Sequence, residues 1–161
     1  MKNRIVARYL QRNAVLWSEW MKDQPVEHKR LYHASPIQDL TEITSGQGRY
    51  QSDGEPLIFG TDNKGYAAGF TFPWYDEDGI VFGYIEDEDF FTLEIPKEKK
   101  HLLYDKPCSI YTIEGDFKKA QEYLPEWATT DEVTIIAEEQ FENPMAALEA
   151  VDNVKVVIKD D

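Results

Sequence analysis

Two kinds of hydrophobic pattern divide the chain. In residues 3–23, apolar and aromatic side chains recur at three- and four-residue spacings, which predicts an amphipathic helix with an aromatic-rich face. Pro25 ends that helix. Beyond it, the pattern changes to short apolar runs separated by turn residues, and each run predicts a strand. The predicted strands are 31–34, 56–61, 79–85, 90–95, 108–113, 132–137 and 154–158.

Three segments between these runs predict helices: 63–70, 116–123 with Asp116 as its N-cap, and 144–150 with a proline in its first turn. Few helices interrupt six or seven strands, so the pattern favours an α+β fold over a regularly alternating parallel sheet. We expect an N-terminal amphipathic helical segment over 1–30 and one α+β domain over 31–161.

Two connections stand out between the predicted elements. The stretch 44–55 is long enough to be a site loop or a flap. The DEDG sequence at 76–79 predicts a hairpin turn.

The composition favours one folded domain. The chain has 161 residues, 42% of them hydrophobic, which is enough to build a core. No apolar run approaches the roughly 20 residues of a membrane span, and no secretory leader opens the sequence, so we expect a cytoplasmic protein. The single cysteine, Cys108, excludes an internal disulfide and is predicted to be a small core residue.

The charge is strongly and unevenly negative. The chain carries 17 basic and 31 acidic residues, a net charge of −14. Residues 1–30 hold seven basic and three acidic groups (+4), which leaves −18 for the rest. Such a body repels nucleic acids and anionic membranes. It supports one hypothesis of function: a non-catalytic interaction or inhibitor protein, of the kind carried by phages and mobile elements, that binds a basic partner protein.

Most familiar catalytic motifs are absent. The sequence has no phosphate-binding GxxxxGK[ST] loop, no GxGxxG fingerprint and no GxSxG elbow. Its three histidines lack metal-ligand spacing, so no metal is predicted. What remains is His33 in LYHAS, at the end of a predicted strand and followed by small and turn-forming residues. There it would point from a sheet edge into a cleft, or serve as a structural histidine.

Three blocks of sequence become more specific when they are read together. LYHASPIQDLTEI, PLIFGTDNKGYAAGF and PEWATTDEVTII resemble the ADP-ribosyltransferase-like superfamily, which includes diphtheria-type toxins, poly(ADP-ribose) polymerases and rifampicin ADP-ribosyltransferases. The resemblance spans about residues 31–137. It implies split antiparallel or mixed sheets and NAD as substrate. It also implies mono-ADP-ribosyl transfer, with a macromolecule as one candidate acceptor, or NAD cleavage.

The resemblance also assigns roles to three residues. Glu126 would be the carboxylate that stabilises the positive charge developing on the ribose as nicotinamide leaves. Tyr66 would stack on the nicotinamide, and His33 would orient the adenosine-side ribose through hydrogen bonds. Further candidates for the NAD pocket are Ala34, Ser35, Phe59, Thr61, Phe72 and Tyr75.

Other interpretations of these residues remain open at the level of sequence. Glu132 is the nearest rival for the carboxylate role, and Glu138 is a weaker one. Tyr66 would also fit the buried face of a short helix, and Glu126 would also fit a surface position before a strand.

Overall fold

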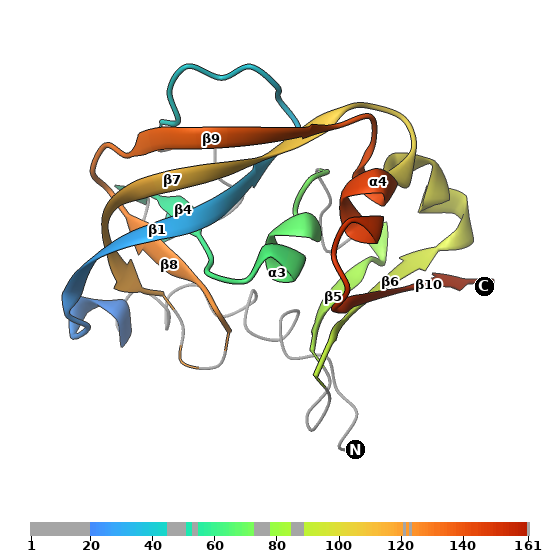
Figure 1. Cartoon of the computed structure of the whole chain (residues 1–161). Coiled ribbons are helices and arrows are strands. Elements are labelled where there is room, and N and C mark those ends of the chain that lie inside the picture. Colours follow the sequence, from blue (N-terminus) through green and yellow to red (C-terminus); the bar gives the residue numbers. More distant parts are fainter. Residues whose placement is uncertain are drawn as a thin grey trace.

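The chain folds into an α+β structure of mostly strands, seen here in a computed structural model (Figure 1). The structure describes residues 20–44, 51–52, 55–72, 78–84, 89–120, 122 and 124–160. Within them, the strands form a five-stranded sheet, a three-stranded sheet and a two-residue pairing of β2 (Gln51–Ser52) with β3 (Glu55–Pro56). The α+β class predicted from the sequence is therefore confirmed.

The longest strand, β7 (Cys108–Lys119), organises the five-stranded sheet. It pairs antiparallel with β1 (Val26–Ser35) along ten residue pairs. On its other side it pairs first with β9 (Thr134–Phe141) and then, at its end, with β8 (Trp127–Thr129). β8 in turn pairs with β4 (Ile58–Gly60).

A short contact brings β4 back to β1. The N–H of Tyr32 donates to the carbonyl of Thr61 at 2.7 Å, and the N–H of Thr61 donates to the carbonyl of Tyr32 at 3.0 Å. The four strands β1, β7, β8 and β4 thereby form a closed ring. One face of each strand points into this ring, and the other points away from it.

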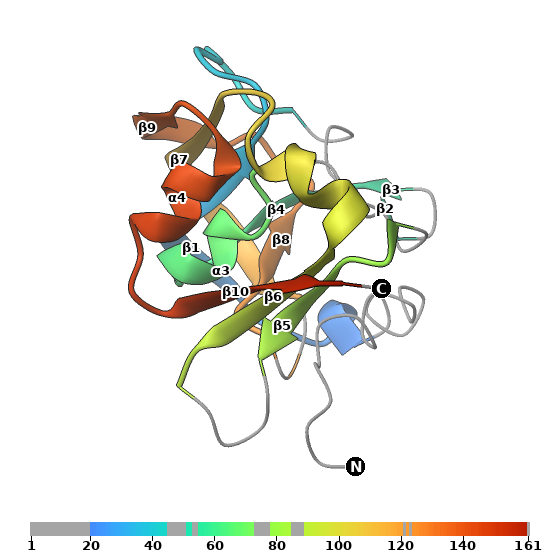
Figure 2. The ribbon, with the colours of Figure 1, turned by 90° about the vertical axis from the view of Figure 1, so that its right-hand side faces the viewer.

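The second sheet has the order β10-β6-β5, with β5 (Val81–Tyr84) antiparallel and β10 (Val154–Lys159) parallel to β6 (Phe91–Pro96). Two short helices, α3 (Lys64–Ala68) and α4 (Pro144–Glu149), lie between the two sheets (Figure 1). A 3₁₀ helix, η2 (Lys97–Leu103), follows β6. In Figure 2 the three strands β10, β6 and β5 can be followed side by side.

Alternation along β1 separates two hydrophobic clusters. Leu31 belongs to the cluster inside the ring, which we call the inner cluster. Tyr32 and Ala34 pack on the opposite side, against the larger cluster between the sheets. We call this second group the inter-sheet cluster. The inner cluster contains Leu31, Ile43, Ile58, Tyr111, Ile113, Phe117 and Trp127. The inter-sheet cluster includes Tyr66, Phe72, Phe82, Phe91, Leu93, Cys108, Ile110, Leu124 and Leu148.

Most of the elements predicted from the pattern are confirmed. All seven predicted strands form, as do the helices predicted at 63–70 and 144–150. Asn63 and Asn143 cap those two helices through their side chains. Cys108 is fully buried and free, as predicted for a core residue.

The helix predicted at 116–123 is wrong, because residues up to 119 continue β7. Phe117 is fully buried in the inner cluster, on the same side of the strand as Tyr111 and Ile113. The predicted cap Asp116 instead accepts a hydrogen bond from His28 across the strand pair at 2.8 Å. Pairing with β1 therefore prevails over the local helical propensity.

Several predictions concern residues outside the described ranges. Of the N-terminal helix at 3–23, only its end is described, and residues 20–22 are helical. Much of the loop at 44–55 and the first half of the DEDG turn also lie outside; Gly79 of that turn has φ 73°. β1 begins at Val26, so it crosses the predicted boundary between 1–30 and 31–161.

Among the described helices, none is long and apolar enough to cross a membrane.

Candidate functional site

A buried hydrogen bond joins two of the three residues singled out in the sequence. The hydroxyl of Tyr66 donates to Oε2 of Glu126 at 2.7 Å, although the residues are 60 positions apart. Tyr66 is 2% exposed and Glu126 is 4% exposed. Glu126 is therefore not the surface acid that the alternative interpretation allowed.

Tyr66 is held by both its backbone and its ring. Asn63 accepts a hydrogen bond from the Tyr66 N–H, which fixes the start of α3. The ring packs against Phe70, Phe82 and Phe91 with centroid separations of 5.0, 5.7 and 5.2 Å. Tyr66 thus lies on the buried face of a short helix. Stacking on a nicotinamide would require one of the neighbouring phenylalanine rings to move.

Glu126 stands at the turn between β7 and β8. Its N–H donates to the carbonyl of Leu124, and its own carbonyl accepts from the N–H of Ala120, both at 2.8 Å. The Lys119 ammonium donates to the same Leu124 carbonyl at 2.9 Å. The backbone hydrogen bonds therefore fix the position of the Glu126 main chain, and the Tyr66 hydroxyl fixes the position of its carboxylate.

Lys119 supplies a positive charge near this turn. Burial lowers the pKa of the Lys119 ammonium, while Asp62 and Glu126 act in the opposite direction. Its Nζ lies 4.9 Å from the centre of the Trp127 ring, and Nζ of Lys29 lies 4.5 Å from the same ring. Lys119 thus interacts electrostatically with the buried Glu126 carboxylate. The spacing of these residues in the sequence does not predict this interaction.

His33 is fixed by a different partner. Its Nδ1 lies 2.7 Å from the carbonyl oxygen of Phe59 on β4. A carbonyl only accepts, so Nδ1 carries the proton and Nε2 is left as an acceptor in the neutral ring. Burial lowers the pKa of His33, against the opposing effect of the hydrogen bond to Phe59, and so favours the neutral imidazole. Among the described residues, Nε2 has no hydrogen-bond partner.

The alternation of β1 determines which face His33 occupies. Side chains two positions apart on a strand share a face, so His33 lies with Leu31 of the inner cluster. Tyr66 belongs to the inter-sheet cluster on the opposite side. The structure thus brings Tyr66 and Glu126 into contact, and it places the His33 ring on the other face of β1.

The remaining candidates from the sequence divide into buried and exposed positions. Ser35, Thr61 and Phe72 are buried, whereas Ala34 and Phe59 are partly exposed. Tyr75 lies outside the described residues. The Oγ atoms of Ser35 and Thr61 accept hydrogen bonds from backbone N–H groups two residues later, so both hydroxyls stabilise turns.

The two rival carboxylates differ in their surroundings. Glu132 is exposed. Glu138 accepts hydrogen bonds from Ser109 Oγ at 2.6 Å and from the Asp39 N–H at 2.9 Å. The hydrogen bond from Ser109 is the largest of the influences that lower the pKa of Glu138, against the opposing effect of burial. Neither rival is hydrogen-bonded to Tyr66 through Oε2 as Glu126 is.

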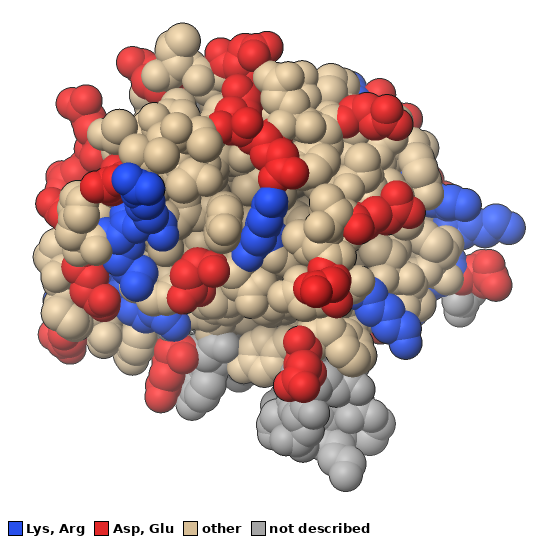
Figure 3. Space-filling model, viewed as in Figure 1, with Lys and Arg blue, Asp and Glu red and all other residues tan. Residues whose placement is uncertain are grey.

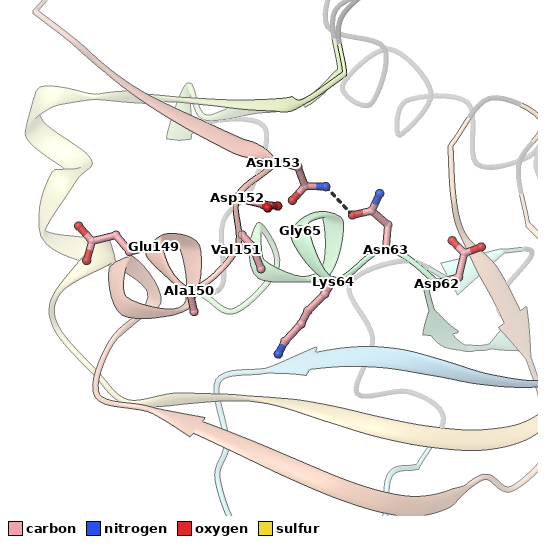
Figure 4. A pocket seen from close by; sticks show the side chains of 9 residues that line it. All are labelled: Asp62, Asn63, Lys64, Gly65, Glu149, Ala150, Val151, Asp152 and Asn153. Atoms are coloured by element: carbon pink, nitrogen blue, oxygen red, sulfur yellow. Dashed lines mark hydrogen bonds between the residues drawn. The ribbon is translucent and has the colours of Figure 1, made fainter.

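A hollow of about 530 Å³ opens beside α3 (Figure 4). Its lining comes from the start of α3 and from the turn between α4 and β10, where the Asn153 amide donates to Asn63 Oδ1 at 3.0 Å. Lys64 also lines it and pairs with Glu139 on β9. The other lining residues are Asp62, Gly65, Glu149, Ala150, Val151 and Asp152.

No group of three or more His, Cys, Asp or Glu side chains in the described ranges is arranged to hold a metal ion. Comparison of the whole chain with protein-family models, curated proteins and solved structures finds no match.

Proposed function

We propose that the chain is an ADP-ribosyltransferase-like protein that binds NAD and cleaves its nicotinamide–ribose bond, passing ADP-ribose to an acceptor. The observation that carries the proposal is the buried hydrogen bond between Tyr66 and Glu126. Burying a carboxylate is costly unless it is hydrogen-bonded, and such groups gather at functional sites. The two-sheet α+β architecture, with His33 on its first strand, is compatible with the fold that the resemblance implies.

Glu126 has the chemistry that the bond cleavage needs. The bond between nicotinamide N1 and ribose C1′ breaks with its electron pair going to N1, and neutral nicotinamide leaves. The ribose is left with oxocarbenium character, and a carboxylate that accepts a hydrogen bond from a ribose hydroxyl stabilises that charge. An oxygen or nitrogen of the acceptor then attacks C1′ and gives up its proton to the carboxylate.

The hydrogen bond to Glu126 supports a positioning role for Tyr66, which the resemblance does not imply. Its hydroxyl donates to Oε2 and so orients the carboxylate. Tyr66 is in this respect a positioning residue. The proposal rests on Glu126 and Tyr66, because the His33 ring lies on the other face of β1.

The test measures binding and turnover on the same samples. Isothermal titration with NAD at up to millimolar concentration reports binding, and chromatography of released nicotinamide reports cleavage. We expect Glu126→Gln to retain NAD binding and to lower the rate by about 100-fold or more, because the amide still accepts from Tyr66 but carries no charge. Tyr66→Phe should lower the rate by a smaller factor.

Glu132→Gln is the matched control, since it makes the same change at an exposed carboxylate and should leave the rate unaltered. Absence of NAD binding at millimolar concentration would overturn the proposal. So would cleavage that is equally fast in the Glu126→Gln variant.

A further inference from the structure

The outer edge of β9 is an open strand edge. β9 pairs with β7 on one side, and none of the described residues pairs with its other side. At its end, the Phe141 carbonyl accepts from the Gln38 side chain at 3.1 Å, which leaves 134–140 as the open stretch. Figure 2 shows β9 at the rim of the structure. An edge of this length presents backbone N–H and C=O groups that another strand can pair with.

This edge is unusually acidic. Residues 131–142 hold five carboxylates and no basic side chain. Glu139 pairs with Lys64 and Glu138 is hydrogen-bonded internally, but Asp131, Glu132 and Glu142 are exposed. Figure 3 shows carboxylates spread over the face to which β9 belongs, with lysine and arginine in a few separate places. Ile136, in the middle of the strand, is 41% exposed and offers an apolar contact.

We infer that the β9 edge is a docking site for an extended, lysine- or arginine-rich segment of a partner protein, which adds to the sheet as a further strand. Backbone hydrogen bonds to 134–140 would supply affinity, and the flanking carboxylates would select basic side chains. The inference does not depend on NAD binding and gives the interaction-protein hypothesis a specific surface.

Charge argues against a second copy of this chain as the occupant. An edge-to-edge pair of β9 strands would bring five carboxylates against five others. Like charges placed directly across a strand pair are destabilising. A basic segment would instead place positive side chains opposite these carboxylates, so the interaction becomes attractive.

The test uses a fluorescein-labelled peptide of about seven residues in which lysine alternates with valine. We expect saturable binding to the full chain by fluorescence anisotropy and slower amide hydrogen exchange in β9. A peptide of the same sequence, N-methylated at alternate residues, has the same charge but lacks half of the backbone donors. It should bind at least about tenfold more weakly.

Two double variants of equal net charge separate the edge from the rest of the surface. Glu132→Lys/Glu142→Lys places lysine at both ends of β9 and should weaken binding about tenfold. Glu98→Lys/Asp160→Lys makes the same change beside the three-stranded sheet and should have little effect. No binding, equal binding of the methylated peptide, or equal loss in both variants would each overturn the inference.

Discussion

His33 illustrates how a backbone partner fixes the state of a titratable side chain. The Phe59 carbonyl accepts from Nδ1, and burial disfavours the charged ring. A protonated His33 would retain this hydrogen bond but would place a charge in a partly buried position. Protonation of His33 should therefore lower the stability of the fold in acid.

We predict that His33 makes the fold sensitive to mild acid. The folded-state pKa lies below the ordinary value of 6.5, so as pH falls through 6.5 the unfolded chain takes up a proton that the folded chain resists. The stabilisation from His33 is thus complete above about pH 6.5 and is lost toward lower pH. We expect the free energy of unfolding in urea to fall less between pH 7.5 and pH 5.5 for His33→Gln than for the unmodified chain.

His28 acts in the opposite direction and must be kept constant in that comparison. Hydrogen bonds to Glu114 and Asp116 raise the pKa of His28, so its contribution is complete below 6.5 and is lost as pH rises. Because both proteins in the comparison retain His28, the difference between them isolates His33. Equal losses in the two proteins would contradict the assignment.

From the sequence, single residues could be proposed as candidates, but their contacts could not be predicted. His33, Tyr66 and Glu126 were found through short blocks that resemble a known superfamily. The contact between Tyr66 and Glu126 depends on how α3 packs against the turn before β8, and no local pattern encodes a separation of 60 residues. The face occupied by His33 follows from alternation along β1, but only once the strand and its partners are known.

At the scale of elements, alternation predicted strands reliably and helix propensity misled at one place. The run DFKKAQEY has helix-forming residues and a capping aspartate, yet 116–119 form strand because 116–118 pair with β1 and 118–119 pair with β8. β8 was missed because three residues, Trp127–Thr129, carry too little periodicity to detect. Its position is set by β7 and β4 on either side.

We predict that a side chain at Gly69, at the end of α3, destabilises the fold. An added Cβ would lie 2.3 Å from the ring of Phe82, which is fully buried. The backbone there, at φ −71°, suits any residue, so the cost is steric. Gly69→Ala should lower the free energy of unfolding by about 1–3 kcal/mol in urea denaturation.

Gly115→Ala provides the comparison for this substitution. Its Cβ would lie 3.1 Å from Cγ1 of the partly exposed Val133 and 3.4 Å from the ring of Phe117, much longer separations than the 2.3 Å at Gly69. It should cost less than Gly69→Ala. A Gly69→Ala protein as stable as the unmodified chain would show that the Phe82 ring moves freely, against the packing described here.

At the scale of the whole molecule, closure of the strand ring stabilises the fold, whereas repulsion within the net negative charge destabilises it. The pairing of Tyr32 with Thr61 closes β4 against β1 and encloses the inner cluster. The charge of −14 is distributed over a small domain and repels itself in the folded state more than in the expanded chain. Cross-strand pairs such as Arg30 with Glu114, at 2.9 Å, are exposed and offset little of this repulsion.

We therefore predict that salt stabilises the fold. Raising the ionic strength from 0.01 to 0.15 M shortens the screening length from about 30 Å to about 8 Å, which weakens long-range repulsion more than contacts at hydrogen-bond distance. The urea midpoint should rise with sodium chloride over this range. Glu132→Lys/Glu142→Lys changes the net charge by four, from −14 to −10, and should show a smaller rise. A midpoint that falls with salt would mean that surface ion pairs outweigh the repulsion, and an equal rise in both proteins would assign the effect to something other than net charge.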